Sequence, residues 1–363
     1  MKIPMMLAFA ALMALDLGAA PIARVGAINW YATIPSTTFI GKCVARSLGP
    51  EMFRDRTPYF AKLVATNKVE FPFRTVEEYE TELRYAIDAG IDYFAYCWYE
   101  ESHPAAVATG EGDLVGMTHA RDLHLKSALR DKLHLCAVLT RESYPDAFMK
   151  ELAATMKLPC YEKVRGRPLL YLFANKWTKA LEQALTACRA AKVPEPYVAV
   201  MAPRRNSELD YSSVQAISTY AAMTATGKTY ESQFAVAMRD NDQRLKSGLE
   251  VIPGFSVGWD PTPRVLNPVP WCVYSKGPYP APATAEQLLA GARKLRQWVA
   301  AHPKECPTGH VIAFAWNEFE EGGWICPNLG PDGKPDFARR DAFAAAVREL
   351  KCADVAEKYP LAR

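Results

Sequence analysis

The sequence predicts an α/β fold, a single (β/α)8 TIM barrel that spans residues 21–363. Two observations lead to this prediction. Apolar strand-like runs alternate with helical patterns about eight times along the chain. These runs are almost continuously apolar, as in parallel strands that are buried on both faces. A doubly wound open sheet is the alternative, but the Gly-rich phosphate turn that usually follows its first strand is absent here.

The expected strands are short runs of apolar and aromatic residues. In chain order they cover residues 25–31, 92–98, 133–140, 168–174, 197–202, 216–222, 250–258 and 310–316. The expected helices cover 75–90, 118–132, 146–156, 178–191, 230–246, a stretch that begins at 284, and 336–350. Two of these helices begin with a capping box, formed by Thr75 with Glu78 and by Thr284 with Gln287.

Two connections that follow strands are unusually long. They cover residues 32–74 and 260–283, and the second is rich in Pro and aromatic residues. Long structured connections of this kind are usually lids or walls of a functional site.

The first 20 residues predict a secretory signal peptide. One Lys precedes an apolar run from Ile3 to Leu15, and small residues follow, so cleavage is expected between Ala19 and Ala23. A short apolar anchor that is retained is the alternative. No later apolar segment is long enough to span a membrane. We therefore expect a secreted or periplasmic protein with no stable membrane insertion after signal cleavage.

Charge and ligand spacing argue against several partners and cofactors. The net charge is +3, with 43 basic and 40 acidic residues well mixed, so no nucleic acid partner is expected. No Cys or His spacing is typical of a zinc site, and we expect no metal and no cofactor. Among the nine Cys, Cys272, Cys306 and Cys326 are candidates for a disulfide in an exported protein.

In a barrel of this type the chemistry lies at the carboxyl ends of the strands. Aromatic, amide and charged residues are concentrated there. Apolar sugar faces stack on aromatic rings, and sugar hydroxyls need carboxylate and amide partners, so this mixture suits a carbohydrate substrate. The candidate substrate-binding residues are Trp30, Tyr96, Trp98, Trp259, Asp260, Arg264, Trp316, Asn317 and Trp324. For Asp260 and Arg264, a salt-linked loop that only holds the wall in place is an equal alternative.

Glu318 and Glu321 are the candidate catalytic pair. They lie three apart in WNEFEEGGW, and in a helical turn this spacing puts both side chains on one face, with Cβ atoms about 5–6 Å apart. Repulsion and burial among aromatic neighbours should raise the pKa of one carboxyl and leave the other ionised. Cleavage of a glycosidic bond requires one acid and one base. An acidic, solvated loop is the alternative, and the spacing leaves retention or inversion of configuration open.

The stretch GWDPTPR, followed about 50 residues later by AFAWNEFEEG, resembles glycoside hydrolase family 99 and the WbsX-like group. AIDAGIDYFAYCWY and GRPLLYLF resemble other strands of that group more loosely, so the similarity covers most of the chain after residue 20. The resemblance implies a (β/α)8 fold and an endo-acting α-mannosidase that retains configuration without a metal.

The same resemblance implies roles for single residues. Glu318 matches the carboxylate that deprotonates the sugar 2-hydroxyl, which then attacks to give an epoxide-like intermediate. Glu321 matches the general acid/base that protonates the leaving oxygen. Positions around the substrate are matched by Trp316, Asn317, Asp260 and Arg264. The chain departs from the family pattern at Pro261, Phe319 and Glu320. These departures leave the carboxylate pair intact but put mannose specificity in doubt.

The first hypothesis is therefore an exported glycoside hydrolase that acts on a polysaccharide or glycan. A glycosyltransferase-like protein of surface polysaccharide metabolism is the second, and the signal peptide argues against it because sugar-nucleotide donors are cytoplasmic. A non-catalytic carbohydrate-binding barrel is the third, and the intact Glu pair argues against it.

Overall fold

The structure, a computed structural model, describes residues 22–100, 116–173, 175–223 and 229–352. The expected signal peptide, residues 1–20, lies outside the described residues. Within them, no helix is both long and apolar enough to cross a membrane.

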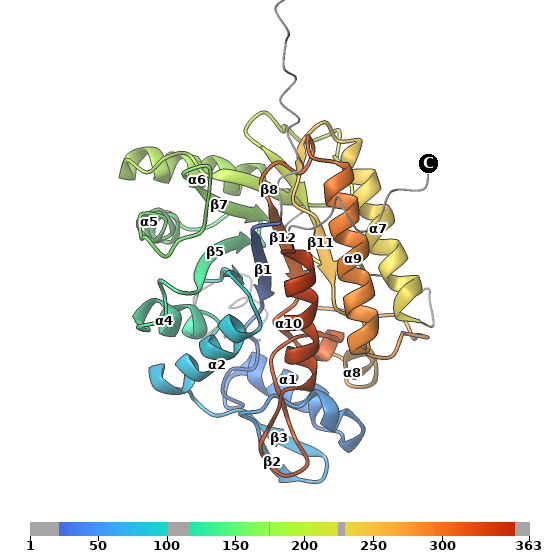
Figure 1. The fold of residues 1–363 in the computed structure, drawn as a ribbon. Coiled ribbons are helices and arrows are strands. Elements are labelled where there is room, and N and C mark those ends of the chain that lie inside the picture. The colour runs from blue at the N-terminus through green and yellow to red at the C-terminus, as the bar shows by residue number, and fades with distance from the viewer. Residues whose placement is uncertain (1–21, 101–115, 174, 224–228, 353–363) are drawn as a thin grey trace, which may run out of the picture.

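A large parallel sheet forms the centre of the molecule and curves into a half-barrel, with helices on its outside (Figure 1). Each strand hydrogen-bonds to the next in the order β10 (Glu250–Val251), β9 (Ala216–Ser218), β8 (Tyr197–Met201), β7 (Arg167–Leu172), β5 (His134–Leu139), β4 (Tyr93–Cys97), β1 (Arg24–Asn29), β12 (His310–Phe314) and β11 (Gly254–Ser256). The short β6 (Lys163–Val164) pairs antiparallel with β7. Every expected strand overlaps one of the observed strands, so the sequence correctly predicts a mixed α/β, TIM-barrel-like architecture.

The expected strand 250–258 is divided into two pieces, β10 and β11. Ile252 and Pro253 separate them, and β10 pairs with β9 while β11 pairs with β12. The backbone continues these pairings, because the N–H of Ile252 donates to Ile217 at 3.1 Å and the carbonyl of Pro253 accepts from Ile312 at 3.1 Å. Pro lacks an N–H and cannot donate within a ladder, which explains the break at this position.

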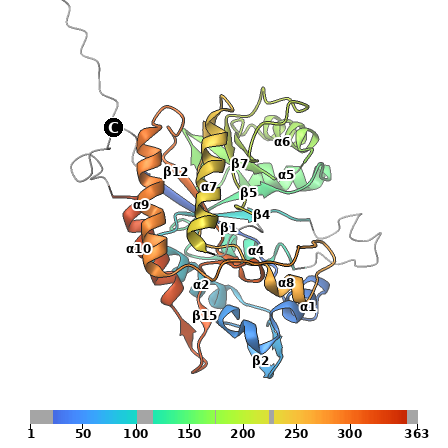
Figure 2. The same ribbon diagram turned by 90° about the vertical axis from the view of Figure 1, so that its right-hand side faces the viewer.

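Helices cover the outer face of the sheet (Figures 1 and 2). They are α2 (Val76–Asp88), α4 (His119–Lys126), α5 (Asp146–Thr155), α6 (Thr178–Ala191), α7 (Tyr230–Leu245), α9 (Ala285–Ala301) and α10 (Ala338–Leu350). Both expected capping boxes are present, at Thr75 and Thr284. The helix expected over 118–132 ends early, because Ser127 adopts an extended backbone and its hydroxyl donates to Glu80 at 2.8 Å.

The two long connections contain structure of their own. The first holds α1 (Phe39–Leu48), the 3₁₀ helix η1 (Glu51–Arg56) and the hairpin of β2 (Lys62–Ala65) and β3 (Lys68–Glu70). The second holds α8 (Thr262–Leu266). The segment after β12 holds β13 (Asn317–Glu318), the 3₁₀ turn η2 (Phe319–Glu321), β14 (Gly323–Trp324), β15 (Asn328–Leu329) and β16 (Pro335–Asp336).

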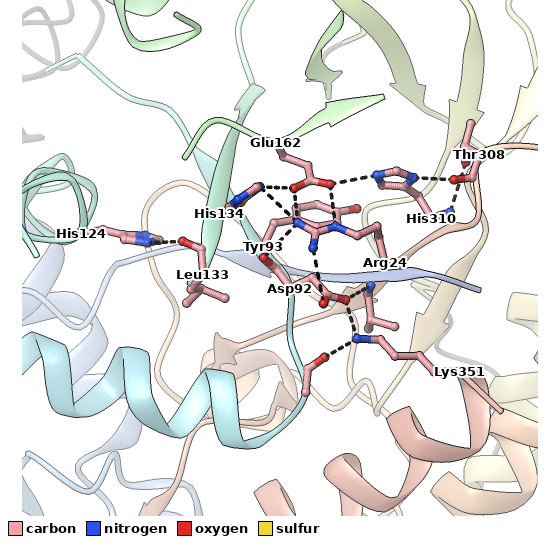
Figure 3. A network of polar contacts seen from close by, with 12 residues as sticks. Arg24, Asp92, Tyr93, His124, Leu133, His134, Glu162, Thr308, His310 and Lys351 are labelled. Atoms are coloured by element: carbon pink, nitrogen blue, oxygen red, sulfur yellow. Dashed lines mark hydrogen bonds and ion pairs between the residues drawn. The ribbon is translucent and has the colours of Figure 1, made fainter. Parts of the chain in front are cut away.

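A buried carboxylate ties together the amino-terminal ends of three strands (Figure 3). Glu162 accepts from Arg24 Nε at 2.9 Å, from His134 Nδ1 at 2.8 Å and from His310 Nε2 at 3.0 Å. These three partners are the first residues of β1, β5 and β12. Burial alone would raise the pKa of Glu162, but the bonds from His134, His310 and Arg24 lower it below its usual value. This end of such a fold serves stability, so the chemistry is expected at the opposite end of the strands.

Candidate active site

The predicted catalytic pair lies in a tight turn just beyond the carboxyl end of β12. Glu318 pairs with Gly323 in the antiparallel β13–β14 ladder, and η2 forms the turn between these strands. Gly322 closes the turn with a φ of +75°. A Cβ on Gly322 would lie 2.5 Å from the backbone nitrogen of Asp260, so only Gly fits this approach.

Glu318 and Glu321 point toward one guanidinium group, that of Arg264 on α8. Glu318 is the N-cap residue of η2 and Glu321 is its last residue, and both carboxyls lie on the side of the turn that faces Arg264. Arg264 Nη1 donates to Glu321 Oε1, and Arg264 Nη2 lies 3.7 Å from Glu318 Oε2. The same Nη2 donates to Glu320 Oε2 at 3.1 Å. Arg264 is 4% exposed, and its guanidinium lies 4.8 Å from the centre of the Trp30 ring.

Each carboxyl of the pair also has a tyrosine donor. The Tyr220 hydroxyl donates to Glu318 Oε1 at 2.7 Å. The Tyr274 hydroxyl donates to Glu321 Oε1 at 2.6 Å. The two tyrosines come from different parts of the chain, beyond β9 and in the long connection 260–283. The two carboxyls therefore have a fixed orientation, each with its own tyrosine donor.

Three buried carboxyls share one guanidinium, so the negative charge of the cluster is not fully balanced. Burial raises the pKa of Glu318 well above its usual value and the charge of Glu321 raises it further, while Arg264 and Tyr220 act in the opposite direction. Burial also raises the pKa of Glu321, and Arg264 and Tyr274 oppose that rise. Because a buried uncompensated charge is costly, a proton is favoured on this pair. The arrangement can therefore hold a proton on one carboxyl and accept a proton on the other.

Asp260 joins the two sequence motifs into one structure. Its carboxylate forms an ion pair with Arg56 and accepts from the backbone N–H of Thr262 at 3.0 Å. Its backbone N–H donates to the carbonyl of Glu321 at 2.7 Å. These bonds hold α8, and hence Arg264, against η2. Substrate contact by Asp260 stays a prediction.

Asn317 and the two aromatic residues Trp30 and Trp259 surround the cluster. Asn317 Oδ1 accepts from the backbone of Trp30 at 2.9 Å, and its amide donates to Asn29 at 3.0 Å. The Trp259 ring meets the Tyr274 ring edge to face, with centres 5.6 Å apart. The structure thus brings these three predicted residues together with the carboxyl pair.

Four other predicted binding residues are packed into the core instead. Tyr96, Trp98, Trp316 and Trp324 are each at most 2% exposed. Trp316 Nε1 donates to Glu82 at 2.8 Å, and Trp324 Nε1 donates to Asn328 at 2.6 Å. The Tyr96 and Tyr79 hydroxyls share a hydrogen bond of 2.8 Å, and the Arg121 guanidinium lies 4.5 Å from the Trp98 ring centre. None of these rings faces solvent in this conformation, so their sugar contacts stay a prediction.

Sequence reasoning missed two aromatic residues in the connection 260–283, Tyr274 and Trp271. Trp271 is 37% exposed and meets the Trp30 ring edge to face at 6.0 Å. The aromatic and Pro-rich composition of the connection was the available signal. This composition indicated that the connection forms a wall of the site, but it could not show which rings reach the carboxyl cluster.

A cavity of about 1070 Å³ opens beside the cluster, over the carboxyl ends of β5, β7 and β8. Phe173 lines it, and the Phe173 ring stacks on the Tyr220 ring with centres 4.3 Å apart. Tyr220 in turn contacts Glu318, so one stacked pair separates the cavity from the carboxyls. The volume lies just above the range of roughly 300–1,000 Å³ that is usual for ligand sites.

Metal-ligating clusters and disulfides are both absent from the described residues. In the described ranges, no group of three or more His, Cys, Asp or Glu side chains could hold a metal ion. None of the nine Cys, all of which lie in the described residues, forms a disulfide. The disulfide considered among Cys272, Cys306 and Cys326 is therefore not formed, and burial raises the pKa of the Cys306 thiol to about 12.

The chain matches no known family profile. It is 27% identical over 225 residues to the uncharacterized protein WxcX of Xanthomonas campestris pv. campestris, in strain B100 and in strain ATCC 33913. That match covers 55% of this chain and 30% of those proteins, so it spans less than a third of their length.

Solved structures that share the fold include the GH99 endo-α-mannosidase of Bacteroides thetaiotaomicron. In complex with BIS-TRIS-propane, that enzyme superposes with a TM-score of 0.53 at 13% identity over 90% of this chain and 97% of its own. A glycoside hydrolase-like protein superposes with a TM-score of 0.53 at 16% identity over 91% of this chain and 94% of its own. At these identities the likeness establishes a glycosidase-like fold.

Proposed function

We propose that the protein is a glycoside hydrolase that cleaves glycosidic bonds in a polysaccharide or glycan, with Glu318 and Glu321 as its catalytic carboxyls. One observation carries the proposal. The two carboxyls lie on one face of a buried turn, share the Arg264 guanidinium, and each accept from a different tyrosine. The fold shared with the endo-α-mannosidases supports it, and endo-action on α-mannosides is its most specific form.

The reaction needs one proton to be given and one to be taken. Glu321 protonates the leaving oxygen while Glu318 takes the proton of the sugar 2-hydroxyl, whose oxygen attacks the anomeric carbon. Water then opens the epoxide-like intermediate, giving its proton to Glu321 as Glu318 returns a proton to the 2-oxygen. Arg264 holds both carboxyls in place, and the proton they share belongs to the pair rather than to one residue.

The segment 250–256 bridges β9 and β12, and as one strand with a break at Pro253 it would close the sheet into an eight-stranded barrel.

Residues 1–20 would direct export and be removed, which makes the mature protein secreted or periplasmic. Mass spectrometry of the protein recovered from the periplasm or medium tests this, and an intact Met1 there would contradict it.

The activity is tested by incubating the purified mature protein with a panel of α-mannans and other polysaccharides, without sugar nucleotides, and detecting released oligosaccharides by mass spectrometry. Release is expected, and Glu318→Gln and Glu321→Gln should each lower it by at least about 100-fold. Glu182→Gln, at an exposed position of α6, is the matched control and should leave release unchanged.

The other outcomes separate the alternatives. Binding without release by the unmodified protein would favour a non-catalytic carbohydrate-binding barrel. Product formation only with a sugar nucleotide would favour a glycosyltransferase-like protein of surface polysaccharide metabolism. Unchanged release by both Gln variants would refute the assignment of the catalytic pair.

A further inference from the structure

The cavity beside the carboxyl cluster is lined by more positive than negative groups. Three arginines line it, Arg141 after β5 and Arg204 and Arg205 after β8. The carboxylate in the lining is that of Glu142. The whole chain has a net charge of only +3 spread over 363 residues, so this concentration of guanidinium groups is local.

Most fully buried arginines in the described residues are neutralised by carboxylates, and Arg244 instead donates to the carbonyls of Ala202 and Ser218. Arg56 pairs with Asp260, Arg74 pairs with Glu82, and Arg264 lies among three glutamates. A guanidinium taken out of water without a partner carries a desolvation cost, which explains these pairings.

Arg141 does not follow this pattern. It is half-buried, and its Nε is buried without a hydrogen-bond partner among the described residues. Its guanidinium lies 5.8 Å from the centre of the Tyr99 ring, and the charge of Glu100 also acts on it. Burial lowers the pKa of Arg141 below its usual value, which reflects the incomplete compensation.

Arg204 and Arg205 are exposed on the loop after β8. Arg205 is held in place, because its guanidinium lies 4.6 Å from the Tyr211 ring centre and donates to the carbonyl of Ser247 at 3.2 Å. In the described part of the chain, no salt bridge joins either residue to a carboxylate. Their donors are therefore available to a ligand in the cavity.

We propose that this cavity is a subsite for a negatively charged sugar residue, one that carries a carboxylate, sulfate or phosphate, within the glycan cut at Glu318 and Glu321. Guanidinium groups bind such anions through paired N–H donors, and the planar fork suits them better than an ammonium group. The inference rests on the proposed function, since the cavity and the carboxyl pair lie on either side of the Phe173–Tyr220 stack.

The test measures binding, because binding does not depend on knowing the bond that is cut. The Glu321→Gln protein is titrated by calorimetry with matched pairs of polysaccharides that share a backbone. The pairs are a uronate polymer and its carboxyl-reduced form, dextran sulfate and dextran, and a phosphomannan and its dephosphorylated form. At least one anionic member is expected to bind about tenfold or more tightly than its neutral partner. The pair that responds identifies the anion.

Substitutions locate the effect in the cavity. Arg141→Gln and Arg204→Gln, each added to Glu321→Gln, should each weaken binding of that anionic polymer by about tenfold. Arg239→Gln, at an exposed position of α7 away from the cavity lining, should leave it unchanged. Thermal unfolding of all variants checks that each is folded.

Each remaining result bears on one of the two proposals. Equal affinity within all three pairs, or equal losses for Arg239→Gln and the cavity variants, would overturn the anionic subsite while leaving hydrolysis of a neutral glycan intact. Failure of every polymer to bind would overturn the proposed function and the subsite together.

Discussion

The hydroxyl of Tyr220 donates a hydrogen bond of 2.7 Å to Oε1 of Glu318, although the two residues are 98 positions apart. The bond favours the ionised form of Glu318 and lowers its pKa against the effect of burial. Tyr274 stands in the same relation to Glu321. Each tyrosine thus lowers the pKa of one carboxyl, so removing each hydroxyl in turn can assign the role of the glutamate that it contacts.

Tyr220→Phe should raise the pKa of Glu318, because it removes a donor that stabilises the carboxylate. If Glu318 acts as the base, the acidic limb of the kcat/KM profile moves to higher pH. Tyr274→Phe should raise the pKa of Glu321, and with Glu321 as the acid the alkaline limb moves to higher pH. Profiles of kcat/KM measured from pH 4 to 10 check both shifts. If Tyr220→Phe moves the alkaline limb and Tyr274→Phe the acidic limb, the acid and base roles of the two glutamates are interchanged. If neither limb moves, both predictions are contradicted.

Arg264→Gln should abolish most activity and destabilise the protein by about 3–5 kcal/mol at neutral pH, because three buried carboxyls lose their cation. The pKa values of Glu318 and Glu321 are already raised, so their contribution to stability is largest at acidic pH and declines as the pH rises through their folded values. Without the guanidinium, the loss of stability with rising pH should be larger.

Urea unfolding of Arg264→Gln and the unmodified protein at pH 5 and pH 8 measures this effect. The stability difference between the two proteins should be larger at pH 8. Arg239→Gln serves as the control for loss of a positive charge. A difference that is the same at both pH values would show that Arg264 does not compensate the carboxyls.

Glu162→Gln should lower stability by about 3–5 kcal/mol and leave the kcat/KM of the folded protein nearly unchanged, because its network lies at the opposite end of the strands (Figure 3). The pKa of Glu162 is lowered in the folded state, so its contribution is present above about pH 4.5 and is lost as the pH falls through the folded pKa. The difference in unfolding free energy between the two proteins, measured at pH 7 and pH 3.5, should be smaller at pH 3.5. A large loss of kcat/KM at 15 °C with the fold intact would contradict a purely structural role.

Trp271→Ala should raise KM by up to about tenfold with little change in kcat or in thermal stability. Trp271 is partly exposed and touches Trp30, which in turn covers Arg264, so its ring can act as a stacking surface for a sugar. Trp271→Phe, which keeps an aromatic face, should recover most of the affinity. Equal KM values in all three proteins would show that the ring does not meet the substrate.

The local features of the fold could be predicted from sequence because short-range rules govern them. The alternation of apolar runs and helical periods located the strands, and the capping boxes at Thr75 and Thr284 located two helix starts. The sequence also predicted a helical turn that carries Glu318 and Glu321; in the structure only Phe319–Glu321 is helical and Glu318 lies in β13.

Other outcomes depended on residues that meet only in the folded chain. Position at the end of a strand suggested that Trp316 and Trp324 face a ligand, yet each has a buried indole N–H bonded inside the protein. The break at Pro253 and the early end of α4 at Ser127 likewise depend on neighbouring strands and on Glu80. Direction of a side chain at a strand end is decided by packing, which periodicity does not encode.

By itself, the sequence determined the order of the secondary-structure elements and the pair of carboxyls that a short turn presents on one face. Only the tertiary structure decided that Arg264 would serve both carboxyls, that Tyr220 and Tyr274 would each take one of them, and that a cavity with three arginines would open alongside. The physical reason is range: hydrogen bonds and periodicity within a turn act over a few residues, whereas these contacts join segments tens of residues apart through the closure of the core.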